Sequence, residues 1–526
     1  LTLLQNRYHG QLNSIYIDPP YNTSASEILY MNSYKHSSWM SMIDNRLDLG
    51  KNLLSNQGGL CATIDDVEFN ELYSIIKLQF NTSNIAGVVP IRINPSGRPT
   101  EQGFALTHEY AIFAKKSKKA EISKMPRTEE QLKRFKEEDS TSIFEYRNLR
   151  REGSNSNRED GQRQYYPIFS NLSNGTIRVP TMNWSEKNRE WTSTEEPNEN
   201  EIIIFPNNDD GLEKNWRWSE ESLRADYSQF LTRIPRNGTP QVYYKYRPNL
   251  EGTTPLTLWS EAKYSATEHG TKPLKDIFGK TLFSYPKSIY AVEDCLSIIG
   301  MSKDNTIALD YFAGSGTTGQ AIININRKKK GKRKYILVEM GEYFDTVTKP
   351  RIQKIIYTDS WKNGKPQTKN GISQIFKYFK LESYEDTLNN LEFKKTKEQQ
   401  KTLDFHPKVK EDYMINYSLD VESQGSLLNI DTFSTPFDYK LKIATSSVGE
   451  TKDTAIDLVE TFNYLLGLVV KRIELLKGYL VVEGQNLKKE KILIIWRDGQ
   501  SSEELNEFFK KMDWSVYDRE FDTIYV

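Results

Sequence analysis

The sequence is poor in the residues that bind metals and form disulfides: its 526 residues include two cysteines and five histidines. The two cysteines, Cys61 and Cys295, belong to no paired motif, which favours a reducing compartment over a disulfide-bonded extracellular fold. The histidines are scattered, and neither an HExxH nor a CxxC motif occurs. These absences argue against a zinc site, and we predict that the protein binds no metal.

Long apolar runs and an excess of charge of either sign are also missing. No apolar run approaches the length that spans a bilayer and no signal peptide opens the chain, so we expect a cytoplasmic protein without membrane contact. The 71 basic residues are balanced by 71 acidic residues, so any basic surface that binds nucleic acid must be local. The chain opens at Leu1 in what reads as the interior of a helix, so we expect a further segment upstream.

What the chain has is length and a regular alternation of strand and helix patterns. Short apolar runs alternate with helical spacing in the first 117 residues and again after residue 270, which predicts an α/β fold with a doubly wound, Rossmann-like parallel sheet. The stretch between is polar, rich in aromatic residues and reads as an insert. We predict residues 1–117 and 271–355 as two parts of one core, 118–270 as an inserted domain, and 356–526 as a C-terminal α+β domain. In the last part, apolar spacing predicts a helix over 454–472.

The first motif is DPPY, formed by Asp18, Pro19, Pro20 and Tyr21 directly after the apolar run SIYI. A strand that ends in a type I turn would also have this sequence, and on the motif alone the two interpretations have about equal weight. The alternative is a rigid loop that presents polar groups to a ligand, because two prolines fix the backbone at little entropic cost.

The second motif is LDYFAGSGTTGQAI, residues 309–322, in which a predicted strand runs into a glycine turn and then into a helix. Glycines permit a tight turn and the close approach of a ligand, and the helix N-terminus offers free N–H groups to an anion. Glu339 ends the next predicted strand, where an acid binds ribose hydroxyls in nucleotide-binding folds. This unit alone would also suit other nucleotide cofactors, and Glu339 alone could be an exposed acid at a strand end.

Together the two motifs are more specific. DPPY followed, after a large insert, by FAGSGTT resembles the β-ordered amino-methyltransferases, which use S-adenosylmethionine to methylate exocyclic amines of DNA bases. The flanking stretches YKHSSWMSMIDNRL and GRPTEQGFALTHEYAIFAKK resemble the modification (Mod) subunits of Type III restriction–modification systems. The resemblance covers most of the chain and is weakest in the insert.

This resemblance implies that the protein is a site-specific DNA methyltransferase acting on the N6 amine of adenine. Cytosine N4 methylation, or a non-catalytic DNA-recognition subunit, is the alternative. It implies double-stranded DNA as substrate, a homodimer, and a helicase–nuclease restriction subunit as partner. The side chain of Asp18 and the carbonyl of Pro19 would accept hydrogen bonds from the target amine, and Tyr21 would stack on a flipped base. The cofactor positions implied by the resemblance are Asp310, Phe312, Ala313, Gly314, Ser315, Gly316, Thr317, Thr318 and Glu339, with Lys287 and Ser288 at the start of the helix that closes the methionine pocket.

Basic residues interleaved with aromatic residues in the insert are the candidate DNA contacts. Such a pattern suits phosphate binding and base stacking. A small domain with an aromatic core and a solvated charged face would give the same pattern, and for any single residue this plainer interpretation is preferred. The candidates are Arg217, Arg233, Arg236, Lys245 and Arg247.

Overall fold

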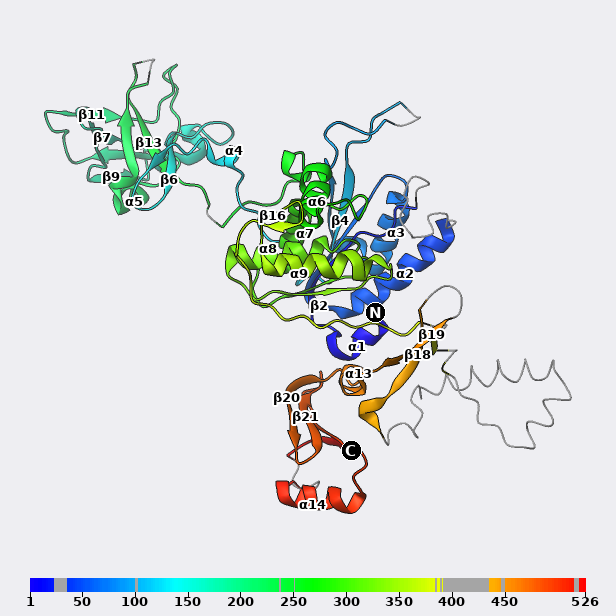
Figure 1. Cartoon of the computed structure of the whole chain (residues 1–526). Helices are drawn as coiled ribbons and strands as arrows, with labels where there is room; N and C mark the ends of the chain where they lie inside the picture. The colour runs from blue at the N-terminus through cyan, green and yellow to red at the C-terminus, as the bar shows by residue number, and fades with distance from the viewer. Residues whose placement is uncertain are drawn as a thin grey trace, which may run out of the picture. The chain divides into compact units, whose positions relative to one another are not determined.

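The structure is a computed structural model, and it describes residues 1–22, 36–99, 103–235, 238–249, 251–383, 386–387, 390, 435–445, 450–514 and 520–526. The chain divides into two compact units, of which one comprises Leu1–Ser123 with Pro255–Val526 and the other Lys124–Thr254 (Figure 1). The division of the chain into four parts stays a prediction.

A six-stranded sheet forms the centre of the first unit, with the strand order β15-β14-β1-β2-β4-β3. The four strands from β15 to β2 are parallel, whereas β4 is antiparallel to both of its neighbours. The predicted α/β fold is confirmed, but the sheet is mixed. The last two strands join without a crossover helix, and a direct connection of this kind makes neighbouring strands antiparallel. The strands are β1 (Leu12–Ile17), β2 (Leu54–Ile64), β3 (Ile85–Ile91), β4 (Glu109–Lys115), β14 (Ile307–Asp310) and β15 (Lys334–Leu337).

The order of the strands reverses between β14 and β1. From β14 the chain continues outward to β15, and from β1 it continues outward in the opposite direction to β2. The two strands at the reversal are far apart in sequence, yet they pair directly, with Ser14 opposite Ala308 and Ile15 opposite Leu309. Ligands of open α/β sheets bind beyond the carboxyl ends of the strands at such a reversal. DPPY follows β1 and the glycine motif follows β14, so both motifs lie at this place.

Two groups of helices cover the sheet (Figure 1). In one group α2 packs on α3, and in the other α8 packs on both α7 and α9. In α2 the buried side chains of Trp39, Ile43 and Leu47 recur every four residues, which places them on one face of the helix. No helix in the described part of the chain is long and apolar enough to cross a membrane. The helices are α1 (Thr2–Tyr8), α2 (His36–Leu53), α3 (Phe69–Phe80), α6 (Lys272–Phe278), α7 (Ile289–Leu296), α8 (Thr317–Lys329) and α9 (Lys349–Tyr357).

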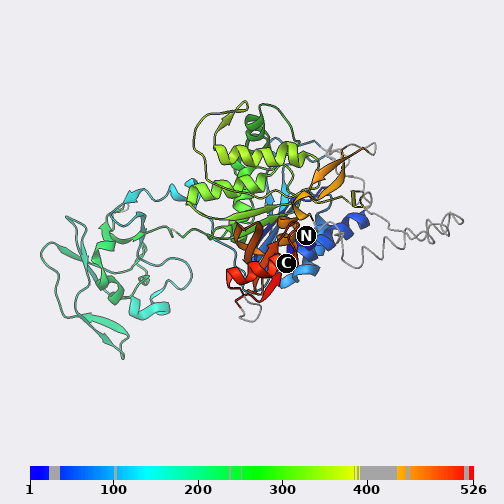
Figure 2. The same ribbon diagram turned by 60° about the horizontal axis from the view of Figure 1, so that its bottom comes forward.

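The second unit, Lys124–Thr254, consists mainly of short antiparallel strands around a small core (cyan to green in Figures 1 and 2). The core contains Trp216 and Tyr166, both almost fully buried. Helices α4 (Glu129–Leu132) and α5 (Glu220–Ala225) are short. The strands are β5 (Glu137–Glu138), β6 (Ile143–Asn148), β7 (Ile168–Asn171), β8 (Ile177–Arg178), β9 (Met182–Ser185), β10 (Glu190–Ser193), β11 (Glu201–Ile204), β12 (Phe230–Arg233) and β13 (Gln241–Tyr246).

The C-terminal part of the first unit contains a four-stranded sheet with the order β20-β21-β22-β23. It is preceded by two small two-stranded sheets, β16 with β17 and β18 with β19. The elements are β16 (Trp361–Lys362), β17 (Lys365–Pro366), β18 (Lys440–Ala444), β19 (Thr451–Ala455), α13 (Leu458–Leu465), β20 (Val469–Leu476), β21 (Tyr479–Gln485), β22 (Lys491–Trp496), α14 (Ser502–Met512) and β23 (Thr523–Tyr525).

The predicted helix over 454–472 is wrong at both ends. The first residues of that range belong to β19, and α13 begins only at Leu458; α13 then stops at Leu465, and β20 begins at Val469. Gly467 makes the turn with a φ of +65°. A Cβ at this position would overlap the carbonyl oxygen of Asn6 in α1, and the side chain of Asn6 donates a hydrogen bond to Leu465 O at 2.8 Å. The chain therefore needs glycine here both for its backbone angle and for contact with α1.

Gly467→Ala should destabilise the protein through two separate effects. The left-handed backbone costs about 1–2 kcal/mol for a residue with a Cβ, and overlap with the Asn6 carbonyl should add about 1–3 kcal/mol. Gly499→Ala is a matched control, because Gly499 has a φ of +81° but nothing within 4 Å of an added Cβ. Denaturant unfolding of both variants should give the larger loss for Gly467→Ala; equal losses would show that contact with α1 is unimportant.

Candidate active site

A cavity of about 340 Å³ lies at the carboxyl ends of β1, β2 and β14. It brings both sequence motifs together, and Lys287, from the segment before α7, lines it as well. Three of the candidates in this unit do not line the cavity: Ser288, Gly316 and Glu339. The candidates that line it are Asp18, Pro19, Pro20, Tyr21, Lys287, Asp310, Phe312, Ala313, Gly314, Ser315, Thr317 and Thr318.

The DPPY loop is anchored at its second proline and two residues after it. The indole N–H of Trp39 in α2 donates to Pro20 O at 2.8 Å. Asn22, which has a φ of +56°, donates from Nδ2 to Glu68 Oε1 at 2.7 Å. Among the described residues no hydrogen bond reaches the carbonyl of Pro19. The loop is thus held at Pro20 and Asn22, and the Pro19 carbonyl remains an acceptor.

The two oxygens of the Asp18 carboxylate differ in their surroundings. Oδ1 accepts hydrogen bonds from Thr63 Oγ1 at 2.8 Å and from the Tyr21 hydroxyl at 2.9 Å. It also lies 3.1 Å from Lys287 Nζ. Oδ2 makes no hydrogen bond or ion pair in the described part of the chain, and the side chain is 26% exposed. One oxygen is therefore fixed by the protein, and the other is available to a ligand.

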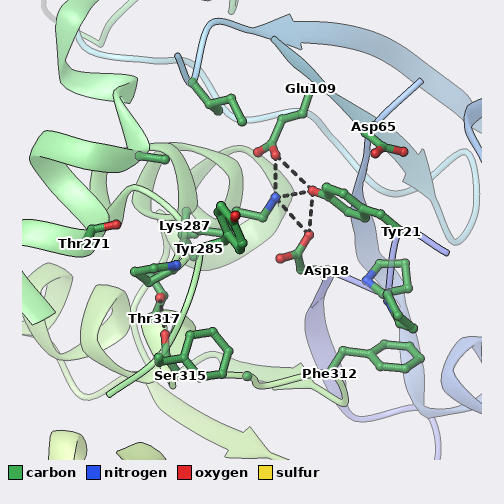
Figure 3. A pocket seen from close by; sticks show the side chains of 18 of the residues that line it. Asp18, Tyr21, Asp65, Glu109, Thr271, Tyr285, Lys287, Phe312, Ser315 and Thr317 are labelled. Carbon is green, nitrogen blue, oxygen red and sulfur yellow. Dashed lines mark hydrogen bonds and ion pairs between the residues drawn. The ribbon is translucent and has the colours of Figure 1, made fainter. Parts of the chain in front are cut away.

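Asp18, Tyr21, Glu109 and Lys287 form one connected cluster, which we call the tetrad (Figure 3). The Tyr21 hydroxyl lies 2.9 Å from Glu109 Oε2, and Lys287 Nζ donates to that oxygen and to the Tyr21 hydroxyl. Burial, followed by the charges of Asp18 and Glu109, raises the pKa of Tyr21. Burial lowers the pKa of Lys287, but the two carboxylates outweigh this effect and raise it, so Lys287 is a cation.

The glycine loop is shaped by positive φ angles, +51° at Gly314 and +82° at Gly316, the residue that precedes α8. Asp310 holds its two ends together, because Oδ1 accepts from Phe312 N at 3.0 Å and Oδ2 from Thr318 Oγ1 at 2.5 Å. Burial raises the pKa of Asp310 to about 7. The expected turn from strand to helix is present, and its aspartate supports the loop from within.

Arg351 in α9 supports the same loop from behind. Its buried guanidinium donates from Nη1 to Ser315 O at 3.1 Å, to Ser315 Oγ at 2.8 Å and to Thr317 Oγ1 at 3.0 Å. Burial lowers the pKa of Arg351 to about 9. The sequence offered no signal for this residue, since an arginine in a C-terminal helix is ordinarily solvated.

Glu339 and Ser288 do not line the cavity, and both make hydrogen bonds to other residues of the protein. Glu339 Oε2 accepts from Gly314 N at 2.8 Å, and Oε1 accepts from Gly341 N at 2.9 Å. Ser288 is buried and donates to Lys263 O at 2.8 Å. Contact of either residue with a cofactor stays a prediction.

The side of the cavity formed by the glycine loop fits an amino-acid cofactor with an aromatic base. Free N–H groups at the start of α8 and the hydroxyls of Ser315 and Thr317 suit a carboxylate. Phe283, Phe312 and Tyr343 line the same cavity and offer aromatic surface. These are the donors and the surface that S-adenosylmethionine requires.

Four of the five candidate DNA contacts can be placed in the second unit. Asp139 accepts hydrogen bonds from Nη1 and Nη2 of Arg247 and pairs with Lys245 at 2.7 Å, and these partners lower its pKa strongly. Arg233 lies 4.0 Å from the ring centre of Tyr146, and Arg217 is exposed. Arg236 lies outside the described residues. The ion pairs of Lys245 and Arg247 fit the plainer interpretation of a charged structural face, and a DNA contact by any of the five stays a prediction.

Sequence reasoning missed several residues around Asp18, among them Thr63 and Glu109. Glu109 stands in the stretch THEYAIF at the start of β4, but one acid at a strand end is too weak a signal by itself. His36, Glu68 and Glu71 form one group that could hold a metal ion. Glu68 is already bound there by His36 at 2.9 Å and by Asn22, so its burial is explained without an ion.

Stability should depend on pH through Asp310. An unfolded aspartate ionises near pH 3.8, whereas folded Asp310 keeps its proton up to about pH 7. Between these values the folded state binds more protons, so stability falls as pH rises. Asp310→Asn removes this effect, and its melting temperature relative to wild type should be higher at pH 8 than at pH 5. Asp304, whose pKa is lowered by backbone N–H groups, gives the control: the difference between wild type and Asp304→Asn should stay constant over this range.

Several known proteins are similar to this chain in sequence. The Type III restriction-modification enzyme EcoPI Mod subunit of Escherichia phage P1 is 27% identical over 408 residues, which is 71% of this chain and 60% of that protein. The Type II methyltransferase M.KpnI of Klebsiella pneumoniae is 31% identical over 339 residues, 62% of this chain and 74% of that protein. The chain thus spans about 60% of the length of the EcoPI relative. The crystal structure of the M1.HpyAVI-SAM complex is 14% identical, with a TM-score of 0.28, and the match covers 65% of this chain and 89% of that one.

The family described as DNA methylase, comprising N6 and N4 methyltransferases, matches residues 12–349. The matched range includes DPPY, the tetrad and the glycine loop, and it confirms the class of protein and the cofactor, S-adenosylmethionine, that the two motifs predict. By this match, the chain belongs to the N6/N4 DNA methylase family.

Proposed function

We propose that the protein transfers a methyl group from S-adenosylmethionine to the N6 amine of an adenine in duplex DNA, as the modification subunit of a Type III restriction–modification system. The observation that carries this proposal is that Asp18 lies in the same cavity as the glycine loop, and that its Oδ2 makes no hydrogen bond or ion pair with any residue that the structure describes. The assignment to a Type III modification subunit is supported by relatives named as Mod subunits, each of which is under 30% identical to this chain.

The reaction needs a better nucleophile than a free base offers. The lone pair of an exocyclic amine is delocalised into the ring, so the amine attacks only after its nitrogen becomes more tetrahedral. Asp18 Oδ2 and the Pro19 carbonyl can accept hydrogen bonds from the two N–H groups, which draws the nitrogen out of the plane and stabilises its growing positive charge. Tyr21 would lie against the flipped base.

When bound, S-adenosylmethionine supplies an electrophilic methyl group. In this chain the N-terminus of α8 with Ser315 and Thr317 would bind its carboxylate, and Phe312 would contact its aromatic base. Asp310, which lines the cavity, and Arg351, which does not, hold these groups in place by hydrogen bonds. The chain's contribution is therefore positioning, which suits a direct displacement.

The remaining parts of the proposal concern recognition and assembly. The second unit, Lys124–Thr254, would recognise the DNA sequence, because it interrupts the methylase core and carries exposed basic residues such as Arg217. A homodimer and a helicase–nuclease partner follow from kinship with Mod subunits alone. The four-part division, with residues 356–526 as a contact domain, belongs to this proposal.

The direct test is to incubate the protein with labelled S-adenosylmethionine and unmethylated bacterial genomic DNA, and then to identify the labelled nucleoside. We expect N6-methyladenine. N4-methylcytosine would keep the reaction class and correct the base. DNA binding without any label would contradict the enzyme assignment and favour a non-catalytic recognition subunit.

Asp18→Asn should lower the rate of methyl transfer by at least about 100-fold, because an amide oxygen is a weaker acceptor for the developing charge. The affinities for DNA and for S-adenosylmethionine should stay close to wild type, as measured by fluorescence anisotropy and calorimetry. Asp44→Asn, on the exposed face of α2, is the control and should keep the full rate. Undiminished turnover in Asp18→Asn would remove Asp18 from the mechanism.

A further inference from the structure

Glu109 lies beside Asp18 although neither motif contains it. It is the first residue of β4, and because β4 is antiparallel to β2, this residue comes to the edge of the sheet where the parallel strands end. Its side chain is 2% exposed, and Lys287, its partner, is 12% exposed. Burial raises the pKa of Glu109, and the Lys287 ammonium, which donates to Oε2, opposes this shift and offsets the charge of the buried carboxylate.

The tetrad contains two carboxylates but one ammonium group, so Glu109 and Asp18 share the charge of Lys287. The ammonium approaches Glu109 Oε2 more closely than Asp18 Oδ1, from which it is 3.1 Å away. Glu109 therefore keeps Lys287 from pairing fully with Asp18. A fully paired Asp18 would be a weaker acceptor for a positively charged amine.

The number of hydrogens available for hydrogen bonds in the tetrad also indicates that Asp18 is held by Oδ1. The hydroxyl of Tyr21 has a single hydrogen but lies 2.9 Å from both Asp18 Oδ1 and Glu109 Oε2. Lys287 donates to Glu109 and to the tyrosine oxygen, which directs the tyrosine hydrogen toward Asp18. Thr63 Oγ1 donates to the same aspartate oxygen at 2.8 Å. Tyr21 and Thr63 thus both donate to Oδ1 of Asp18, and Lys287 lies 3.1 Å from it, whereas Oδ2 makes no hydrogen bond or ion pair with the described residues.

We propose that Glu109 is a positioning residue for methyl transfer: through Lys287 and Tyr21 it fixes Asp18 by Oδ1 and leaves Oδ2 to the target amine. The inference rests on the proposed function and extends it to a residue outside both motifs. It also gives Lys287 a role at the target base, either in addition to a contact with the cofactor or in place of it. Experiment can distinguish a role of Lys287 at the target base from a contact with the cofactor.

The test compares Glu109→Gln, Lys287→Met and the double variant under single-turnover conditions, with labelled S-adenosylmethionine in excess and the genomic DNA that wild type methylates. Glu109→Gln keeps size and hydrogen-bonding capacity but removes the charge that holds Lys287. We expect its rate constant to fall about 10- to 100-fold, with dissociation constants for cofactor and DNA within about 3-fold of wild type. The double variant should be no slower than the slower single variant, because the pair acts as one unit.

Glu293→Gln is the matched control. Glu293 in α7 is also buried and also pairs with a lysine, Lys328, but it does not line the cavity. Its substitution should leave the rate constant unchanged, and thermal melting of all variants separates a loss of fold from a loss of rate. An unchanged rate in Glu109→Gln, or a loss explained entirely by weaker cofactor binding, would overturn the proposal.

A second measurement does not depend on turnover, so failure of the proposed function is distinguishable from failure of this inference. The reactivity of Lys287 toward reductive methylation, followed by mass spectrometry, should be low in wild type because two carboxylates hold its proton. It should rise in Glu109→Gln and also in Asp18→Asn, and stay low in Glu293→Gln. If Lys287 reacts equally in wild type and Glu109→Gln, the tetrad does not act as one unit and the proposal is wrong, whether or not DNA is methylated.

Discussion

The parallel pairing of β1 with β14 is the interaction on which the candidate site depends. It joins two strands that stand almost three hundred residues apart in the chain and places the ends of both at one edge of the sheet. Each strand is followed by a loop that hydrogen bonds hold in place, from Trp39 in α2 for the DPPY loop and from Thr318 for the glycine loop. A shift of one residue in this pairing would turn Asp18 to the other face of the sheet, because side chains alternate along a strand.

Buried charge is concentrated around these two loops, and it is used differently in each. Arg351 has no carboxylate partner among the described residues and instead donates to the glycine loop, so its positive charge stands behind the place proposed for an anionic carboxylate. In the tetrad, one cation serves two carboxylates, which leaves an excess of negative charge where a positive amine would develop. Low exposure strengthens both effects, since fewer water molecules screen the charges. The positive charge behind the glycine loop therefore suits the cofactor's carboxylate, and the negative charge of the tetrad suits the positive charge that would develop on the target amine.

Both loops could be predicted because their signals are local. Two prolines after an apolar run, and glycines between a strand and a helix, restrict the backbone wherever they occur, and the cavity does contain Asp18, Gly314 and their neighbours. Glu109, Thr63 and Arg351 could not be predicted, because an isolated acid, hydroxyl or arginine acquires its importance only from residues brought near by the fold. The reversed direction of β4 was missed for a related reason: apolar patterns identify strands but say nothing of which strand is their neighbour.

The C-terminal helix illustrates how tertiary contact overrides a periodic pattern. Apolar residues continue at helical spacing past Leu465, yet α13 ends there, and the chain turns at Gly467, directly against the backbone of Asn6 in α1. This turn lets Arg7 donate to Leu468 O at 3.1 Å. The same apolar residues then fit a strand, since Val469 and its successors pair with β21. Spacing in a short segment is compatible with either structure, and the glycine together with its neighbour in space decides between them. The tetrad follows the same rule, because a lysine before α7 and a glutamate at the start of β4 are unremarkable until the sheet brings both to Asp18.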